Sequence, residues 1–148
     1  MRGIKIAVSG KGGAGKTTLA AALIRAYAAT HRRVYAVDAD PDASLALALG
    51  LSPEEAAEIR PVIEFKDRIR EVMGGEGEFF RLNPELGKVL DDFCYRLGNI
   101  LFIRMGELKR AGTSCYCREN AFLNALVSAL LLERDEVVVM DMPLLSLH

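Results

Sequence analysis

The sequence predicts an α/β fold in which a mostly parallel sheet carries helices on both of its faces. Short apolar segments rich in β-branched residues alternate along the chain with longer segments that have helical spacing. A glycine-rich segment separates the first expected strand from the first expected helix. Parallel strands need a crossover connection, which a helix provides, so the alternation indicates strand–helix–strand units.

The first part of the chain is expected to contain two strands and two helices. Residues 4–8 are apolar and β-branched, and residues 17–29 place large apolar side chains at helical spacing among alanines. Residues 34–37 form a second apolar strand, and a following proline cannot continue its ladder. A short apolar helix is predicted at 42–49, where Gly50 ends it.

The rest of the chain has weaker signals up to residue 98 and clear ones after it. Ser52 followed by proline is typical of a helix start. The further expected elements are a flexible loop at 74–77, a helix from 83 towards 96, a buried strand at 99–105, a helix at 118–133 and a strand at 137–140.

Length and composition limit the classes of protein that need to be considered. The 148 residues suffice for one compact domain, and no segment resembles a linker, so a single domain is predicted over residues 1–148. A formal net charge of -1 excludes a strongly basic nucleic-acid binder. No apolar run approaches the ~20 residues of a membrane span, and no secretory signal is visible. Three cysteines in such a chain predict reduced thiols in the cytoplasm.

Residues 10–17 fit the phosphate-binding pattern G-x-x-x-x-G-K-[ST], with a strand before the pattern and a helix after it. Glycines let consecutive backbone N–H groups converge on phosphate oxygens, and the following helix adds the positive end of its dipole. Lys16 supplies a cation for the β and γ phosphates, Thr17 offers a hydroxyl to Mg²⁺, and Thr18 is placed to reach the α phosphate. The predicted nucleotide-binding residues are Gly10, Lys11, Gly12, Gly13, Ala14, Gly15, Lys16, Thr17 and Thr18.

Acidic residues stand at the carboxyl ends of two expected strands, where ligands bind in open α/β sheets. The spacing of Asp38 and Asp40 places both carboxylates on one side of an extended segment. Asp141 ends the strand at 137–140 in the manner of a Walker B carboxylate, which can hold Mg²⁺ through water. The alternative is that the Asp38–Asp40 pair only begins a turn, because Asp-Pro is common in turns.

Cys115 and Cys117 are two residues apart, so their thiolates can face one soft metal ion such as zinc, copper(I) or nickel. Two sulfurs do not complete a four-ligand site. The pair therefore suggests a site shared across a two-fold axis, with two cysteines from each subunit. The alternative is a pair of buried thiols that bind no metal. Cys94 lies apart from the pair and is expected to be a small core residue.

Residues 11–18 resemble the deviant Walker A loop of a superfamily of dimeric P-loop ATPases. This superfamily includes the nitrogenase iron protein, septum-site and chromosome-partition ATPases, and metal-cluster maturation ATPases. The resemblance implies ATP as the nucleotide and a nucleotide-dependent homodimer in which Lys11 reaches the partner's nucleotide. It also implies that Asp40 orients or activates the attacking water and that Asp38 lies near the Mg²⁺ shell. The expected catalytic residues are Lys11, Lys16 and Asp40, and the expected Mg²⁺ ligands are Thr17, Asp38 and Asp141.

Residues 105–106 and 112–121 resemble the corresponding stretch of the accessory ATPases of carbon monoxide dehydrogenase, which assist nickel insertion. The resemblance implies that Cys115 and Cys117 bind nickel or zinc at the dimer interface and that carbon monoxide dehydrogenase is the client. The alternatives are a partition or division-positioning ATPase of the same superfamily, or an inactive nucleotide-binding fragment. The superfamily continues with an acidic residue and Ala-Gly after the position of Asp141, whereas this chain continues with Met142 and Pro143. We therefore expect a domain that is incomplete at its C-terminus and needs the missing half for ATP hydrolysis.

Overall fold

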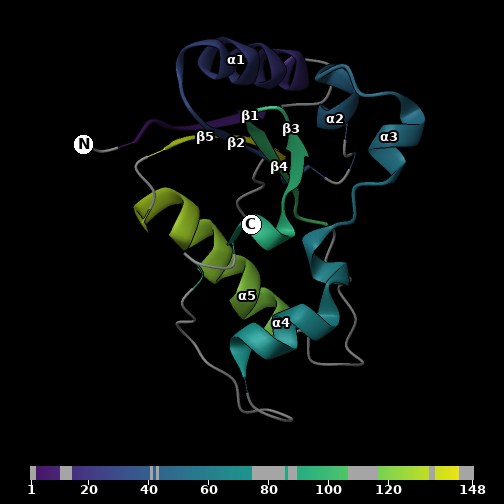
Figure 1. Ribbon diagram of the computed structural model, residues 1–148, viewed down its shortest axis with the longest axis vertical. Helices are drawn as coiled ribbons and strands as arrows, with labels where there is room; N and C mark the ends of the chain where they lie inside the picture. The colour runs from purple at the N-terminus through teal and green to yellow at the C-terminus, as the bar shows by residue number, and fades with distance from the viewer. Residues whose placement is uncertain are drawn as a thin grey trace.

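The computed structural model describes residues 3–10, 15–40, 42, 44–74, 86, 90–106, 117–133 and 136–143. Within them, five strands form one sheet in the order β1-β5-β2-β4-β3 (Figure 1). All neighbouring strands are parallel except β3, which pairs antiparallel with β4. The strands are β1 (Lys5–Gly10), β2 (Val34–Asp38), β3 (Tyr95–Leu97), β4 (Ile100–Arg104) and β5 (Val137–Pro143).

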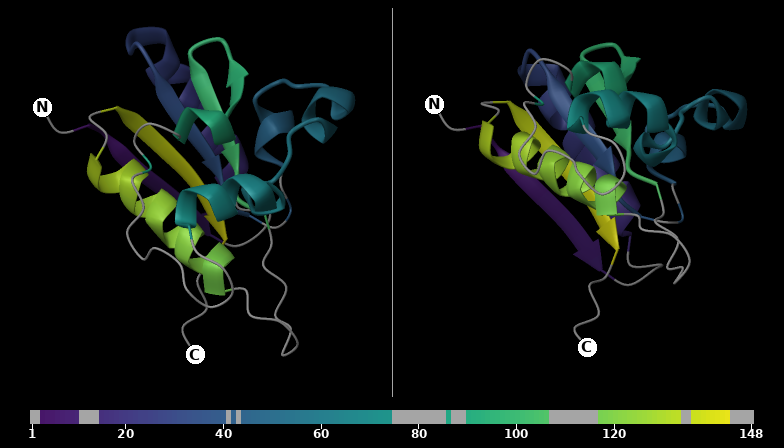
Figure 2. Two further views of the ribbon diagram at one scale, coloured as in Figure 1. Left: turned by 60° about the horizontal axis from the view of Figure 1, so that its bottom comes forward. Right: turned by 90° about the horizontal axis from the view of Figure 1, so that it is seen from below.

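Helices cover both faces of the sheet, which confirms the predicted fold class. Figure 1 shows α1 with α2 and α3 on one side and α4 with α5 on the other, and Figure 2 shows α5 across the face of β1 and β5. The helices are α1 (Lys16–Thr30), α2 (Leu45–Ala48), α3 (Pro53–Ala57), α4 (Lys66–Met73) and α5 (Cys117–Ser128). The described residues also form two 3-10 turns (Val62–Glu64 and Leu90–Phe93) and a π-helical turn after α5 (Ala129–Glu133).

The apolar core consists of two clusters, one on each face of the sheet. Strand β2 contributes to both clusters because its side chains alternate between the two faces. Tyr35 and Val37 join a cluster that includes Phe122 of α5. Val34 and Ala36 join the other cluster, which includes Ile24 of α1. Every residue of β2 is buried, as expected for a central strand with helices on both sides.

The prediction of a helix from residue 83 towards residue 96 is wrong for the last residues of that range, which the structure describes. Residues 95–97 instead form β3, which pairs with residues 100–102 of β4. A two-residue turn joins the strands, and Gly98 takes a positive φ of 61° there. A Gly-Asn turn between apolar segments is a hairpin signal, and pairing with the exposed edge of β4 overrides the helical tendency of the segment.

Other boundaries differ from the prediction in smaller ways. The helix expected at 42–49 is limited to Leu45–Ala48. Before it, the backbone N–H groups of Asp40 and Asp42 donate hydrogen bonds to the carboxylates of Asp38 and Asp40. The helix expected at 118–133 is α-helical only to Ser128 and ends in the π-helical turn. Strand β5 continues past Asp141, where its last residue pairs with Gly10. No prediction was made for α4.

Candidate nucleotide-binding site

The parallel register brings the acidic strand ends together at one edge of the sheet. Asp141 of β5 lies opposite Val8 of β1 on one side and Asp38 of β2 on the other. The helix α1 begins beside them at Lys16, directly after Gly15, whose φ of 80° lies in the left-handed region that glycine favours. The start of α1 and the strand ends that carry Asp38 and Asp141 therefore lie at the same edge of the sheet.

Lys16 contacts two of these aspartates directly. Its Nζ donates a hydrogen bond to Oδ2 of Asp40 at 2.7 Å and another to Oδ1 of Asp141. Lys16 is 9% exposed and Asp141 is fully buried. Burial lowers the pKa of Lys16, but the hydrogen bonds and charges of Asp141 and Asp40 outweigh it and raise the pKa above its usual value. The ammonium group is thus charged and held away from solvent.

The Thr17 hydroxyl joins the same cluster. Its Oγ1 donates a hydrogen bond to Oδ2 of Asp141 at 3.0 Å, so the two oxygens of this carboxylate bind Lys16 and Thr17 separately. The Lys16 hydrogen bond is also the main reason why the pKa of Asp40 lies below its usual range. Residues predicted to bind phosphate therefore contact residues predicted to act on Mg²⁺ and water.

Asp38 is buried beside these groups, and within the described residues the hydrogen bonds of Lys16 and Thr17 go to Asp40 and Asp141 instead. It is 1% exposed, and burial is the main cause that raises its pKa to about 6. Its Oδ1 accepts a hydrogen bond from the Asp40 backbone N–H at 3.2 Å. Its Oδ2 is buried and has no hydrogen-bond partner in the described part of the chain. A buried oxygen of this kind is where a metal-bound water would find an acceptor.

The oxygens at this edge fit a magnesium ion. Mg²⁺ takes oxygen ligands, keeps several waters and is bound in proteins through one or two carboxylates together with substrate phosphates. Asp141, the Thr17 hydroxyl and the unpaired Oδ2 of Asp38 provide such a set. Among the described residues, no three histidine, cysteine, aspartate or glutamate side chains are grouped to enclose a metal.

Two residues near the site were not predicted from the sequence. Ser44 precedes α2, and its Oγ lies 3.5 Å from Oγ1 of Thr17 instead of capping the helix. Arg104 ends β4 directly opposite Asp38, and its positive charge lowers the pKa of that aspartate. The available signals were a serine at the entrance of a short helix and an arginine at the end of an apolar strand, and neither is specific.

Of the remaining predicted site residues, the structure describes some and leaves others outside the described part of the chain. Gly10 ends β1 and Thr18 is exposed in the first turn of α1. Lys11, Gly12, Gly13, Ala14 and Cys115 lie outside the described residues. Cys117 begins α5, but its side chain is not described. The roles of Lys11 and of the cysteine pair therefore stay predictions.

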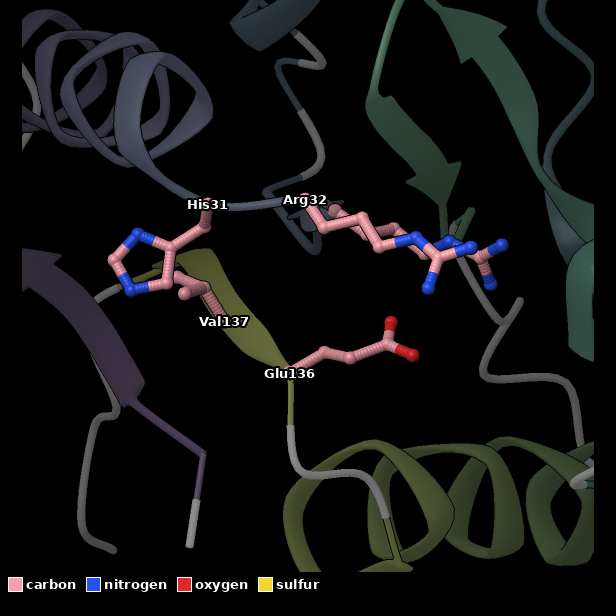
Figure 3. A pocket seen from close by; sticks show the side chains of 5 residues that line it. His31, Arg32, Glu136 and Val137 are labelled. Atoms are coloured by element: carbon pink, nitrogen blue, oxygen red, sulfur yellow. The ribbon is translucent and has the colours of Figure 1, made fainter. Parts of the chain in front are cut away.

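A pocket of about 350 Å³ lies at the opposite end of the sheet, where β2 and β5 begin (Figure 3). His31, Arg32 and Arg33 line it together with Glu136 and Val137. Arg33 is already paired with Asp91, 3.4 Å away. The pocket is thus far along the strands from Lys16 and carries charges of both signs, so it is not part of the phosphate site.

Comparison with known protein families identifies the domain. Residues 5–142 match the family model of the CobQ/CobB/MinD/ParA nucleotide binding domain. The chain belongs to this family. It is therefore a nucleotide-binding domain of the CobQ/CobB/MinD/ParA type. Within the described residues, no helix has both the length and the apolar character to cross a bilayer.

Two relatives and one solved structure show how far this similarity reaches. An uncharacterised ATP-binding protein of Methanocaldococcus jannaschii is 38% identical over 94% of this chain and 54% of its own length. The carbon monoxide dehydrogenase accessory protein CooC of Rhodospirillum rubrum is 39% identical over 94% of this chain and 54% of its own. The chain thus spans about half the length of these relatives.

The solved structure is cobyrinic acid a,c-diamide synthase from Mycobacterium smegmatis with bound ADP and magnesium. It matches with a TM-score of 0.53 and 26% identity, over 97% of this chain and 51% of that one. Together with the family match, this supports the P-loop assignment of the fold. A partition or positioning role and an inactive nucleotide-binding fragment both stay predictions, because the family includes proteins of several functions.

Proposed function

We propose that this chain is the ATP-binding part of a maturation factor that delivers nickel to carbon monoxide dehydrogenase. The observation that carries the proposal is the 39% identity to CooC over 94% of the chain, combined with the Cys115 and Cys117 pair. A general family assignment would account for the phosphate loop but not for two thiols at this spacing. The described nucleotide site supports the ATP-dependent part of the proposal.

The residues at the sheet edge have separate roles in this function. Lys16 binds the β and γ phosphates, while Thr17, Asp38 and Asp141 hold Mg²⁺ directly or through water. When bound, Mg²⁺ supplies positive charge that stabilises the phosphates during transfer. Asp40 accepts a hydrogen bond from the attacking water and orients it. Asp40 becomes available for this role once Lys16 has moved to the phosphates, because the two side chains form an ion pair at 2.7 Å.

The proposed active form is a homodimer that forms with ATP bound and separates after hydrolysis. Lys11 from one subunit places a cation on the phosphate charge of the other subunit's nucleotide, where charge spreads in the transition state. Nickel is the cargo, held by Cys115 and Cys117 of both subunits. Four thiolates complete the tetrahedral set that one chain cannot provide.

Metal stoichiometry tests the shared site. The purified chain is loaded with Ni²⁺ or Zn²⁺ in the presence of ATP, and native mass spectrometry measures the mass of the intact complex. One metal ion per two chains is expected, with loss of the metal in Cys115→Ser and in Cys117→Ser. Cys94→Ser is the matched control, because Cys94 contacts the Leu90 carbonyl in the core and lies outside the pair. One metal ion per single chain, retained in Cys115→Ser, would contradict the proposal.

A further inference from the structure

The pocket at the start of β2 and β5 lies at the opposite end of the sheet from Lys16, and the function proposed above does not use it. Its volume of about 350 Å³ is at the lower end of the range of pockets that bind small molecules (Figure 3). Its lining contains three basic side chains, one carboxylate and one apolar side chain: His31, Arg32, Arg33, Glu136 and Val137. A ligand that fits this pocket is therefore small and charged.

Arg32 gives the pocket a cation that no group in the described part of the chain neutralises. Its side chain is exposed and forms no hydrogen bond or ion pair with any described residue. The neighbouring Arg33 differs, because its guanidinium is paired with Asp91 at 3.4 Å. A guanidinium group is planar and can hold a carboxylate through two parallel hydrogen bonds. Arg32 can therefore bind a ligand carboxylate without breaking a contact within the protein.

Glu136 places a negative charge in the same pocket. Its side chain and that of Arg32 extend to the same side of the pocket, away from His31 (Figure 3). A hydrogen bond with Tyr35 is the main cause that raises the pKa of Arg33, and the charge of Glu136 adds to it. A carboxylate has about four acceptor positions, so Glu136 can accept hydrogen bonds from a ligand in addition to its contacts within the protein. It would repel a ligand that carries only negative charge.

His31 and Val137 provide the less polar part of the lining. Nδ1 of His31 lies 2.9 Å from Oγ1 of Thr30, and the ring of Tyr27 meets the imidazole edge-on with 5.4 Å between ring centres. These two contacts fix the orientation of the imidazole. Val137 is 2% exposed and belongs to the apolar core. The pocket therefore offers a fixed surface to a small apolar group beside its two charges.

We propose that this pocket binds a free α-amino acid. Arg32 binds the carboxylate of the amino acid, and Glu136 accepts hydrogen bonds from its ammonium group. The two ligand charges must lie close together, because the Arg32 and Glu136 side chains extend to the same side of the pocket. The side chain of the amino acid contacts His31 and Val137. This inference goes beyond the proposed function and is independent of it.

L-alanine is the first probe, because its side chain adds only a methyl group to the two charges. L-alaninamide lacks the carboxylate, and N-acetyl-L-alanine lacks the ammonium group. Each compound is titrated into the ¹⁵N-labelled chain at neutral pH, and the NMR shifts of the Arg32, Arg33 and Val137 backbone amides report binding in the pocket. We expect L-alanine to bind with a Kd on the order of 1 mM, and each analogue on the order of tenfold more weakly.

Two variants assign the charges of the ligand to the two side chains. Arg32→Met should bind L-alanine on the order of tenfold more weakly than the wild type and should no longer prefer it to L-alaninamide. Glu136→Gln should no longer prefer L-alanine to N-acetyl-L-alanine. Arg70→Met is the matched control, because Arg70 is an exposed arginine in the last turn of α4 and does not line the pocket. It should bind all three compounds like the wild type.

The dispersion of the NMR spectra verifies that each variant is folded. A loss of one preference in each variant is a change in specificity, which a purely structural role of these side chains would not produce. The inference would be overturned by L-alanine that leaves the three amides unshifted, or by equal binding of L-alanine and its two analogues. Folded Arg32→Met and Glu136→Gln proteins that keep the preferences of the wild type would overturn it as well.

Discussion

Arg104 at the end of β4 lies directly opposite Asp38 at the end of β2. On its other side, Asp38 is opposite Asp141, whose negative charge raises the pKa of Asp38 while Arg104 lowers it. Arg104 is itself fixed, because its Nη1 donates hydrogen bonds to the carbonyls of Ala56 at 3.1 Å and Ile59 at 3.0 Å. The buried aspartate thus lies between a like and an opposite charge, and the arginine is bound to α3 at Ala56 and to Ile59 just after it.

Asp38→Asn should stabilise the protein at neutral pH. Burial raises the pKa of Asp38 from 3.8 to about 6, so the folded state binds a proton more tightly than the unfolded state. The wild type therefore loses stability as the pH rises from about 4 to about 6, by about 3 kcal/mol at most, and the variant does not. Urea unfolding at pH 4 and pH 7.5 measures this: the two proteins should be similar at pH 4, and the variant more stable at pH 7.5.

Asp40→Asn should change the stability of the fold at neutral pH in the opposite direction. The Lys16 hydrogen bond lowers the pKa of Asp40, so this carboxylate stabilises the fold above its unfolded pKa and loses that effect as the pH falls through its folded pKa. The variant should be less stable than the wild type at neutral pH, with the difference closing in acid. Equal pH profiles for the Asp38 and Asp40 variants would contradict both assignments.

Arg104→Met should destabilise the fold by about 2 kcal/mol, because two carbonyls lose a charged donor. Arg60→Met is the matched control. Arg60 donates to one carbonyl, that of Glu64, at an exposed position, and its guanidinium lies 4.5 Å from the centre of the Phe65 ring. Its replacement should therefore cost about 1 kcal/mol, less than that of Arg104. Chemical unfolding measures the free energy of unfolding of both variants. A smaller loss of stability for Arg104→Met than for Arg60→Met would show that the hydrogen bonds to Ala56 and Ile59 contribute little to the fold.

Gly106→Ala should be more damaging than Gly98→Ala, although both glycines have a positive φ. A Cβ at Gly106 would lie 2.8 Å from both Pro61 and Ile63, whereas a Cβ at Gly98 would meet nothing within 4 Å. We expect a loss of about 3 kcal/mol for the first and about 1 kcal/mol for the second. Thermal unfolding of the two proteins measures the difference, and equal losses would argue against close packing of Gly106 on Pro61.

The sequence predicts the sheet and its phosphate-binding edge because those signals are local. Apolar β-branched runs mark β2, β4 and β5, and the glycine-rich pattern places Lys16 and Thr17 at the start of α1. Strand β3 was missed because its three residues are held by pairing with β4 and have little strand character of their own.

The contacts between side chains within the site depend on tertiary structure, so they could not be predicted from the sequence as the strands and the glycine-rich pattern could. Spacing placed Asp40 and Asp141 near the phosphate loop, but nothing in the sequence showed that both would contact Lys16. The charge partner of Asp38 is Arg104, which is 66 positions away in the chain and is brought opposite by strand register alone. Such pairs follow from strand order, which local patterns do not specify.

MgATP binding by the wild type and by Lys16→Met tests the central claim most directly. Because the β and γ phosphates are proposed to bind the Lys16 ammonium, isothermal titration should show binding by the wild type and an affinity lower by on the order of tenfold or more in the variant. Lys66→Met on the exposed end of α4 should bind like the wild type. Equal MgATP affinity in Lys16→Met and the wild type, or no binding by a folded wild type, would contradict the account.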